Sequence, residues 1–409
     1  MLTRGPLFRA CCTTCAPTGC GSANIADLVM KERFEGIQVA RAAAALLVVI
    51  WHVGGVKEKF PDVQVTAATW LQFGEGGVDL FFVISGFIIS HVAREPFSAS
   101  DFLLKRFLRI YPFYALFTGL ALAAFLINPA WHLGSEAPTG TAGIVESFFV
   151  IPQNNYPLLF VGWSLEHEVL FYLIAAALFL AGQRQLLAPL LMSLFGIGAV
   201  LRLLVGNFWD WHLLSPFHLE FAIGVLLYQY RTRLVAVEPC WAMVLGAGCY
   251  CLTAWIFKGD GLPAAWPERA DVTVLLVRVV GFGIGAGFLL LAAVNFHMPR
   301  SRNGRIFGPI LALLMLLGDA SYTLYLSHPF VLSLMGKAGL ALHLQRLSAL
   351  ILLGCSIIAA MAVAAIFYRI VEKPYLDFVH ARVERRAPGK ERLPVDAVLT
   401  ADPTTPINA

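Results

Sequence analysis

The sequence predicts an all-α fold: a polytopic integral membrane bundle of about ten transmembrane helices, with both termini in the cytoplasm. Hydrophobic residues make up 58% of the 409 positions and charged residues only 14%, whereas an average soluble domain is about 25% charged. The apolar residues are gathered in runs of about 20, the length at which a helix crosses a bilayer. This composition excludes a soluble globular enzyme.

Ten runs of the sequence are long and apolar enough to be read as membrane spans. The first covers residues 37–56, and the ninth is long and interrupted by a proline. The other nine are predicted at 76–93, 110–128, 158–181, 186–206, 214–230, 239–257, 272–295, 309–335 and 347–371.

The basic residues predict which side of the membrane each loop faces. With the N-terminus inside, the inside segments hold 21 Lys and Arg, the outside loops six and the spans three. The predicted outside segment 129–157 contains no Lys or Arg. Because cytoplasmic loops are enriched in these residues, the split favours this orientation and an even number of spans.

Two tails flank the predicted membrane domain of residues 34–376. Residues 1–33 are polar and lack the apolar core of a signal peptide, so we expect a disordered tail. Because Met30 stands just before the first span, our hypothesis is that translation begins there. Residues 377–409 are charged and then rich in proline and threonine, which predicts a disordered cytoplasmic tail.

The first span carries two ionisable residues, Arg41 and His52. Such a residue inside a membrane helix costs about 2.5–3.5 kcal/mol or more and usually serves a function. Their spacing of eleven comes within about 20° of three full turns and covers about 16 Å. The two side chains are therefore predicted to share one helix face, with the arginine near the cytoplasm and the imidazole near the outer surface.

A cluster of arginines is predicted on the cytoplasmic side, where Arg106 and Arg109 join Arg41. The guanidinium group is a rigid fork of donors that suits phosphate, so these residues point to an anionic ligand. The alternative is that Arg106 and Arg109 only anchor the end of a helix, as positive-inside residues do.

A second polar cluster is predicted in the outer halves of the spans. It contains His52, Asp79, Glu168 and His328, and also Arg202, His218, Glu220 and Arg278. Imidazole titrates near neutrality and a carboxylate can hold its tautomer, which suits acid–base chemistry on a hydroxyl. Glu166 lies about 200° from Glu168 around the helix and is interpreted as interfacial. The alternatives are that His52 and Glu168 are satisfied packing residues and that Asp79 caps the second span.

Six stretches, in this order and spacing, resemble the acyltransferase-3 family of bacterial integral membrane acyltransferases. They are Arg41–His52, Gly77–Phe87, Lys105–Pro112, Trp163–Tyr172, Ser321–His328 and Val371–Pro374. The resemblance covers residues 34–376, and the short loops are most similar to the members that acetylate exopolysaccharide.

The resemblance implies a multi-pass O-acyltransferase of the bacterial inner membrane. It would move an acetyl or other short acyl group from cytoplasmic acyl-CoA to a hydroxyl of an extracytoplasmic glycan, such as exopolysaccharide or O-antigen. The expected partners are the lipid bilayer, the glycan and the polysaccharide-biosynthesis machinery, and no nucleic acid. Cys12 and Cys15 have the spacing of half a zinc site, but no second half follows, so we expect no metal.

The resemblance also implies roles for the clustered residues. Arg106 and Arg109 would dock the phosphates of acyl-CoA, and Arg41 would hold the donor deeper in the bundle. His52 would deprotonate the acceptor or carry the acyl group, and the sequence does not choose between these. Glu168 would orient His52 or the acceptor, with Asp79 as a second candidate. The residues expected on the acceptor side are Tyr322, Tyr325 and His328, although such tyrosines also occur as interface-belt aromatics.

Two rival functions fit some of the same residues. Buried His, Glu and Arg also suit a proton-coupled transporter or exporter of a polysaccharide precursor. Transporters often show inverted repeats, and the two halves of this sequence show no pairing of Gly- or Pro-broken spans. A non-catalytic scaffold for a polysaccharide synthase is disfavoured because His52 and Glu168 are present.

Overall fold

The computed structural model describes residues 25–57, 72–92, 97–131, 133, 140–153, 156–205, 212–256, 272–296, 307–342 and 349–385. Residues Glu32–Gly389 form one compact unit that contains the membrane helices. The second unit, Met1–Lys31 with Lys390–Ala409, is described only at the start of the first helix. Much of both predicted tails, including Cys12 and Cys15, therefore lies outside the described residues.

The described residues form helices and one isolated β-bridge, between Leu133 and Leu159. The first half holds α1 (Ile25–His52), α2 (Gly54–Lys57), η1 (Gln72–Glu75), α4 (Gly76–Val92), α5 (Ala99–Ile127), η2 (Pro129–Trp131), α6 (Gly140–Phe149), η3 (Phe160–Gly162), α7 (Trp163–Leu180), η4 (Arg184–Leu186) and α8 (Leu187–Val205). The second half holds α9 (His218–Gln229), α10 (Arg231–Leu234), α11 (Pro239–Ile256), α12 (Val272–Asn295), α13 (Phe307–Asp319), α14 (Ser321–Ala341), α15 (Ala349–Phe367), η6 (Tyr368–Glu372) and α16 (Lys373–Arg385). Helix therefore extends into both predicted tails, at α1 and at α16.

The all-α, multi-pass membrane fold is confirmed. Within the described ranges, eight helices are long and apolar enough to cross a membrane, and the bent pair α13–α14 makes a ninth. The difference from the predicted ten lies at 214–230, where α9 has only 12 residues. That is about 18 Å of helix, against a hydrocarbon core of about 30 Å. The orientation of the termini stays a prediction.

The predicted ninth span, 309–335, is broken at a different residue from the one that the sequence suggested. The chain bends by 82° between α13 and α14, at Ala320, whereas Pro329 lies inside α14. The new helix starts with a hydrogen bond of 2.8 Å from Leu324 N to Ala320 O. The bend leaves Asp319 at the end of α13 and Ser321 at the start of α14, beside the cavity of the candidate active site.

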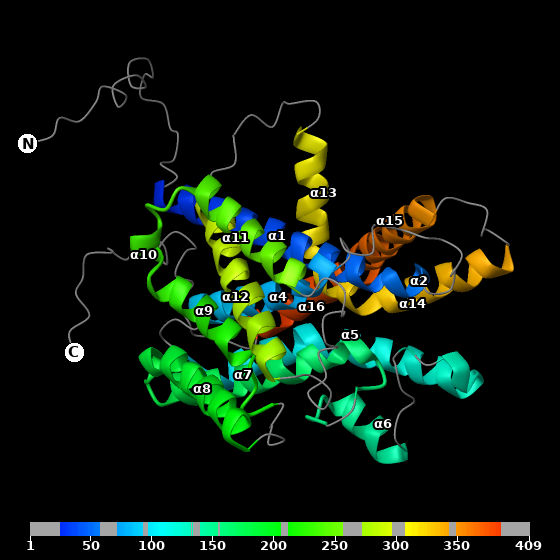
Figure 1. The fold of residues 1–409 in the computed structure, drawn as a ribbon, viewed down its shortest axis with the longest axis horizontal. Coiled ribbons are helices and arrows are strands. Elements are labelled where there is room, and N and C mark those ends of the chain that lie inside the picture. Colours follow the sequence, from blue (N-terminus) through cyan, green and yellow to red (C-terminus); the bar gives the residue numbers. More distant parts are fainter. Residues whose placement is uncertain are drawn as a thin grey trace, which may run out of the picture. The chain divides into compact units, whose positions relative to one another are not determined.

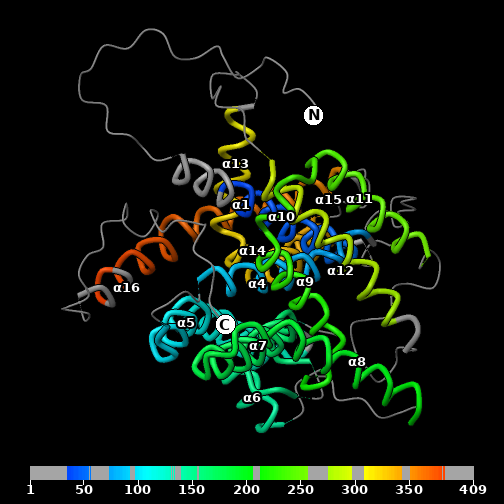
Figure 2. Tube along the Cα trace, turned by 90° about the vertical axis from the view of Figure 1, so that its left-hand side faces the viewer, coloured from blue at the N-terminus to red at the C-terminus, as the bar shows by residue number. Residues whose placement is uncertain are grey.

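Helix α4 is the centre of the bundle. Among the candidate spans it has the largest buried share, 78%. In both views, α4 and α9 lie between a group that includes α1, α11 and α12 and a group that includes α5, α7 and α8 (Figures 1 and 2). Two glycines allow α4 and α9 to touch backbone to backbone: a Cβ on Gly86 would lie 2.2 Å from Phe221 O, and one on Gly224 would lie 2.0 Å from Val83 O. Small residues at such crossings are typical of membrane helix pairs.

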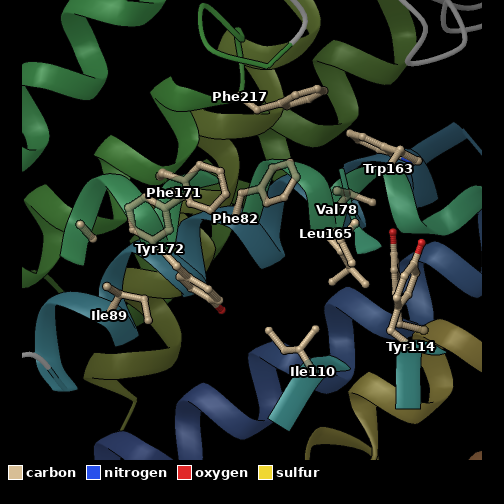
Figure 3. Close-up of a cluster of buried hydrophobic side chains, with 14 of the residues drawn as sticks. Val78, Phe82, Ile89, Ile110, Tyr114, Trp163, Leu165, Phe171, Tyr172 and Phe217 are labelled. Carbon is tan, nitrogen blue, oxygen red and sulfur yellow. The ribbon is translucent and has the colours of Figure 1, made fainter. Parts of the chain in front are cut away.

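Aromatic side chains pack between α4, α9 and α7 (Figure 3). Phe82 lies with its ring centroid 4.7 Å from that of Phe221 and 5.4 Å from that of Phe217. Phe221 in turn stacks on Phe171 of α7 at 4.3 Å. This rigid layer fixes α7 against α4 and thereby holds the carboxylates of α7 in place.

Candidate active site

Five helices, α1, α4, α5, α7 and α14, supply the walls of a cavity of about 130 Å³. The polar part of its wall includes six residues that the sequence predicted for the site. They are Arg41, Arg106, Arg109, Glu168, Tyr322 and Tyr325. Ser85, Ser164, Tyr172 and Ser321 are further polar residues of the wall. Members of the predicted inner and outer clusters therefore meet in one space.

Two of the arginines that line the cavity, Arg41 and Arg106, are weakly bonded within the described part of the chain. Arg41 makes one long hydrogen bond, 3.4 Å from its NH1 to Gln38 Oε1. The guanidinium of Arg106 lies over the rings of Phe102 and Tyr172, 5.8 Å from each centroid. Its Nε is buried without a hydrogen-bond partner in the described part of the chain. A buried donor of this kind favours an anionic ligand, because leaving it unpaired costs free energy.

Glu168 is held by two hydroxyl groups in the wall of the cavity. Its Oε1 accepts a hydrogen bond of 2.8 Å from Ser85 Oγ and another from the Tyr172 hydroxyl. Ser85 lies on α4 and Tyr172 one turn further along α7. Both hydroxyl groups can donate to a carboxylate, so together they fix the position of the Glu168 side chain in the wall.

His52 is paired with the predicted residue His328, and not with a carboxylate. His52 Nδ1 lies 2.9 Å from Val48 O and 3.2 Å from His328 Nε2. His328 Nδ1 lies 3.1 Å from Leu324 O. A carbonyl oxygen only accepts, so each neutral ring carries its proton on Nδ1, and His52 Nδ1–H is also directed at His328 Nε2. His52 Nε2 is therefore left with a lone pair.

The histidine pair stands behind one wall of the cavity. His328 packs against Tyr325, with ring centroids 6.1 Å apart, and Tyr325 lines the cavity. The Tyr325 hydroxyl donates to Val161 O at 2.8 Å and lies 2.7 Å from Ser164 Oγ. His52 also packs against Phe160, at 5.1 Å. His52 therefore does not line the cavity, and its contacts connect it to the cavity wall through His328 and then Tyr325.

Asp79 lies elsewhere, in a buried ion cluster that faces α12. Arg278 donates through Nε to Glu75 Oε1 and through NH2 to Asp79 Oδ2, both at 3.0 Å. Glu220 of α9 is buried beside them. Arg278 thus gives Asp79 a structural partner, and Asp79 is not among the residues that line the cavity.

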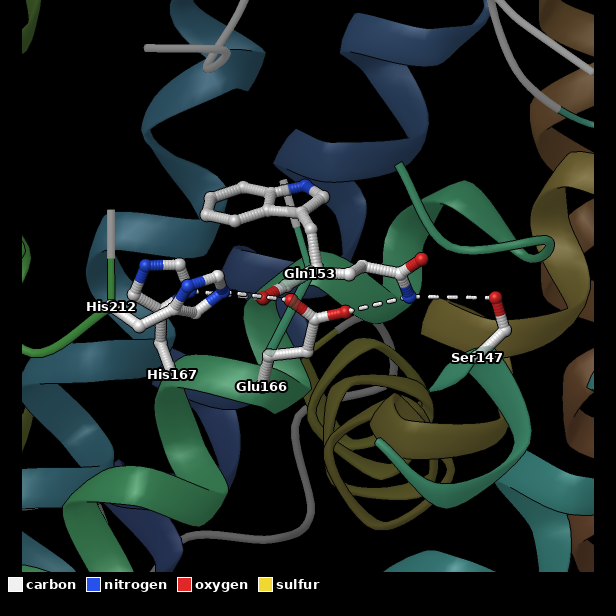
Figure 4. Close-up of polar contacts among 6 residues, drawn as sticks. Ser147, Gln153, Glu166, His167 and His212 are labelled. Atoms are coloured by element: carbon white, nitrogen blue, oxygen red, sulfur yellow. Dashed lines mark hydrogen bonds and ion pairs between the residues drawn. The ribbon is translucent and has the colours of Figure 1, made fainter. Parts of the chain in front are cut away.

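Glu166 is buried, so the interpretation of this residue as interfacial is wrong. It is 2% exposed and accepts hydrogen bonds from His212 Nε2 at 2.8 Å and Gln153 Nε2 at 3.2 Å (Figure 4). Gln153 also reaches Ser147 Oγ, at 3.4 Å. The helix angle correctly turned Glu166 away from Glu168, but a segment from beyond α6 covers the side that was expected to face the interface.

Sequence reasoning missed several residues of this site. Ser85 and Tyr172 lay inside recognised motifs but were given no role, although they hold Glu168. Gln153 and His212 lie in connecting segments, where hydrophobic periodicity carries no signal. Their only sign in the sequence is that they are polar residues beside apolar runs.

The residues described above form a site for an anion and place a base near it. The arginines supply donors and positive charge, and His52 Nε2 supplies a lone pair behind His328 and Tyr325 of the cavity wall. Among the described residues, no group of three or more His, Cys, Asp or Glu side chains could hold a metal ion. Such a set of residues can bind an anionic reactant and remove a proton from a second one.

Comparisons with known proteins agree with this chemistry. A family model described as an acyltransferase domain matches residues 34–369. The exopolysaccharide production protein ExoZ of Rhizobium meliloti is 30% identical over 323 residues, covering 76% of this chain and 92% of ExoZ. The acyltransferase MdmB of Streptomyces mycarofaciens is 23% identical, covering 86% and 93%. The peptidoglycan O-acetyltransferase OatA of Listeria monocytogenes is 23% identical, covering 73% of this chain and 46% of OatA. No solved structure matches the chain significantly.

Proposed function

This chain belongs to the acyltransferase-3 family and is a multi-pass membrane acyltransferase, and we propose that it moves an acetyl or other short acyl group from cytoplasmic acyl-CoA to a hydroxyl of an extracytoplasmic glycan. One observation carries the proposal: three arginines share a cavity whose Tyr325 wall packs against the His52–His328 pair. The polysaccharide acceptor is supported by the names of ExoZ and OatA.

The donor is proposed to bind with its phosphates at the arginines. Acyl-CoA is strongly anionic, and guanidinium groups form paired hydrogen bonds with phosphate oxygens. Arg106 and Arg109 lie on α5, which the predicted orientation opens to the cytoplasm, and Arg41 extends the positive charge into the bundle. The unpaired Nε of Arg106 would gain an acceptor on binding.

The acceptor hydroxyl is proposed to meet His52 Nε2. The base takes the hydroxyl proton while the oxygen attacks the thioester carbonyl, the C–S bond breaks, and the thiolate leaves as CoA and is protonated. His328 acts as a positioning residue, because its Nε2 holds the Nδ1–H tautomer of His52. An acyl-histidine intermediate would use the same Nε2, so both routes need this tautomer. In either route Tyr325 must move aside.

The test of this function is transfer of label from [14C]acetyl-CoA to glycan by membranes that contain the full chain. We expect His52→Ala to lower the rate about 10²–10⁴-fold, the usual contribution of a general base, with normal expression and folding. His91→Ala, at the cytoplasmic end of α4, is the matched control. Normal acetylation by the His52 variant would exclude the catalytic assignment. Uptake of glycan precursor without label in it would favour a transporter.

A further inference from the structure

A turn of π-helix interrupts the long helix that runs from α15 into α16. It covers Tyr368–Glu372, and such a turn adds one residue and so rotates the rest of the helix by about 100° relative to an unbroken α-helix. Glu372 is 1% exposed, whereas Ile370 and Val371 just before it are 70% and 38% exposed. The turn therefore directs a carboxylate, and not an apolar side chain, toward the interior. Single π-turns occur frequently at functional sites.

Two contacts hold Glu372 and the start of α16 close to the wall of the cavity that the arginines line. Thr323 Oγ1, fully buried and next to the cavity residue Tyr322, donates a hydrogen bond to Glu372 Oε2. One helical turn after the bulge, the Tyr375 hydroxyl donates to Leu108 O at 3.2 Å. Pro112 has no N–H to bond to this carbonyl, so α5 has a vacant acceptor there, next to Arg109. Tyr375 uses that acceptor to dock α16 on α5.

Glu372 is one of two carboxylates near a pair of arginines. Arg41 and Arg109 line one cavity, where two like charges repel each other, and an ionised Glu372 is near enough to attract both electrostatically. Asp319, placed by the bend between α13 and α14, attracts the same two arginines. Two guanidinium groups inside a membrane bundle are costly without a counter-charge, because the low dielectric strengthens their repulsion. Glu372 is the more deeply buried of the two carboxylates and is the one anchored by a hydrogen bond.

We propose that Glu372 is the internal counter-ion that competes with the anionic donor for Arg41 and Arg109 and so promotes release of the CoA product. The proposal rests on the proposed function, since it takes acyl-CoA as the anion. With the site empty, Glu372 stabilises the two arginines. With CoA bound, the carboxylate repels the phosphates and limits their affinity. Once the acyl group has left, this repulsion speeds the departure of CoA.

The test measures CoA on the purified full-length chain, by its inhibition constant in the transfer assay and by titration calorimetry. In Glu372→Gln we expect CoA to bind about tenfold more tightly, the effect of removing one partly screened charge close to the site. The turnover number should fall, because product release becomes slower, and KM for acetyl-CoA should fall with it. Glu372→Asp should bring the CoA affinity and the turnover number part of the way back to the wild-type values. Thr323→Val, which removes the hydrogen bond to Glu372, should tighten CoA binding and lower the turnover number, as Glu372→Gln does, but by less.

The control is Glu238→Gln, before α11, which should leave CoA affinity unchanged. A merely structural Glu372 would lower activity without tightening CoA, so unchanged or weaker CoA binding in a folded Glu372→Gln or Thr323→Val chain overturns the proposal. A wild-type chain that binds no CoA at all overturns the donor assignment and the counter-ion role with it. Tight wild-type binding together with unchanged variants overturns the counter-ion role alone.

Discussion

Arg278 shows how one residue can decide the stability of a membrane bundle. It is fully buried and bonds Glu75 and Asp79, while Glu220 lies against Asp79. Three ionised carboxylates with one arginine would leave two uncompensated negative charges in the bundle. A buried charge without a partner is costly, so the carboxyl groups of this cluster depend on Arg278.

At this scale, Arg278→Met is expected to destabilise the protein by about 3–5 kcal/mol, because it leaves the carboxylates without their partner. Thermal unfolding of the detergent-purified chain is the measurement. Arg233→Met is the control: this arginine is exposed and contacts the Tyr230 ring, so a change within about 0.5 kcal/mol is expected. Equal shifts for the two variants would show that the cluster contributes no special stability.

At the scale of elements, the crossing of α4 and α9 depends on two glycines. Each packs its Cα against a backbone carbonyl of the partner helix, so neither helix can yield by a change of rotamer. The crossing holds Ser85, which donates to Glu168, next to Gly86. The packing of α4 on α9 at Gly86 therefore also determines the position of Ser85 in the wall of the cavity.

Gly86→Ala and Gly224→Ala should each destabilise the chain by about 1–3 kcal/mol, the usual cost of overpacking. The added Cβ would lie 2.2 Å and 2.0 Å from a carbonyl oxygen, respectively. Gly196→Ala and Gly248→Ala are matched controls inside α8 and α11, where a Cβ meets nothing within 4 Å. These two should be neutral or slightly stabilising, because alanine is the better helix former. Thermal unfolding compares all four, and tolerance of alanine at Gly86 and Gly224 would contradict the close crossing.

At the scale of the whole molecule, the proposed reaction has a direction across the membrane. The predicted orientation puts the arginine side toward the cytoplasm, where acyl-CoA is found, and the histidine pair toward the outside. The separation of the arginines from the histidine pair does not depend on residues of the loops. It arises from the order of residues along α1, α5 and α14.

Sealed vesicles of both orientations test this arrangement. Inside-out vesicles should use added acetyl-CoA at once, whereas right-side-out vesicles should use it only after they are made permeable, because the anionic donor does not cross lipid. A second membrane protein of known orientation reports the orientation of each preparation. Equal rates in intact vesicles of both kinds would contradict the predicted topology.

The sequence alone determined the membrane class and nearly all the spans. Hydrophobic runs and helix periodicity are local properties, so they can be read from a few neighbouring residues. The bends and short helices were less accessible: the break at Ala320 and the 12-residue α9 depend on what packs around them.

Only the tertiary structure decided the partners. His52 pairs with His328 across 276 positions and Asp79 with Arg278 across 199, and the sequence placed the members of both pairs in one outer layer without pairing them. Glu166 was assigned to the interface because nothing local reports that a distant segment would cover it. Helix faces are set by the chain's own geometry, whereas ion pairs inside the bundle are set by which faces meet, and that depends on the packing of all the helices together.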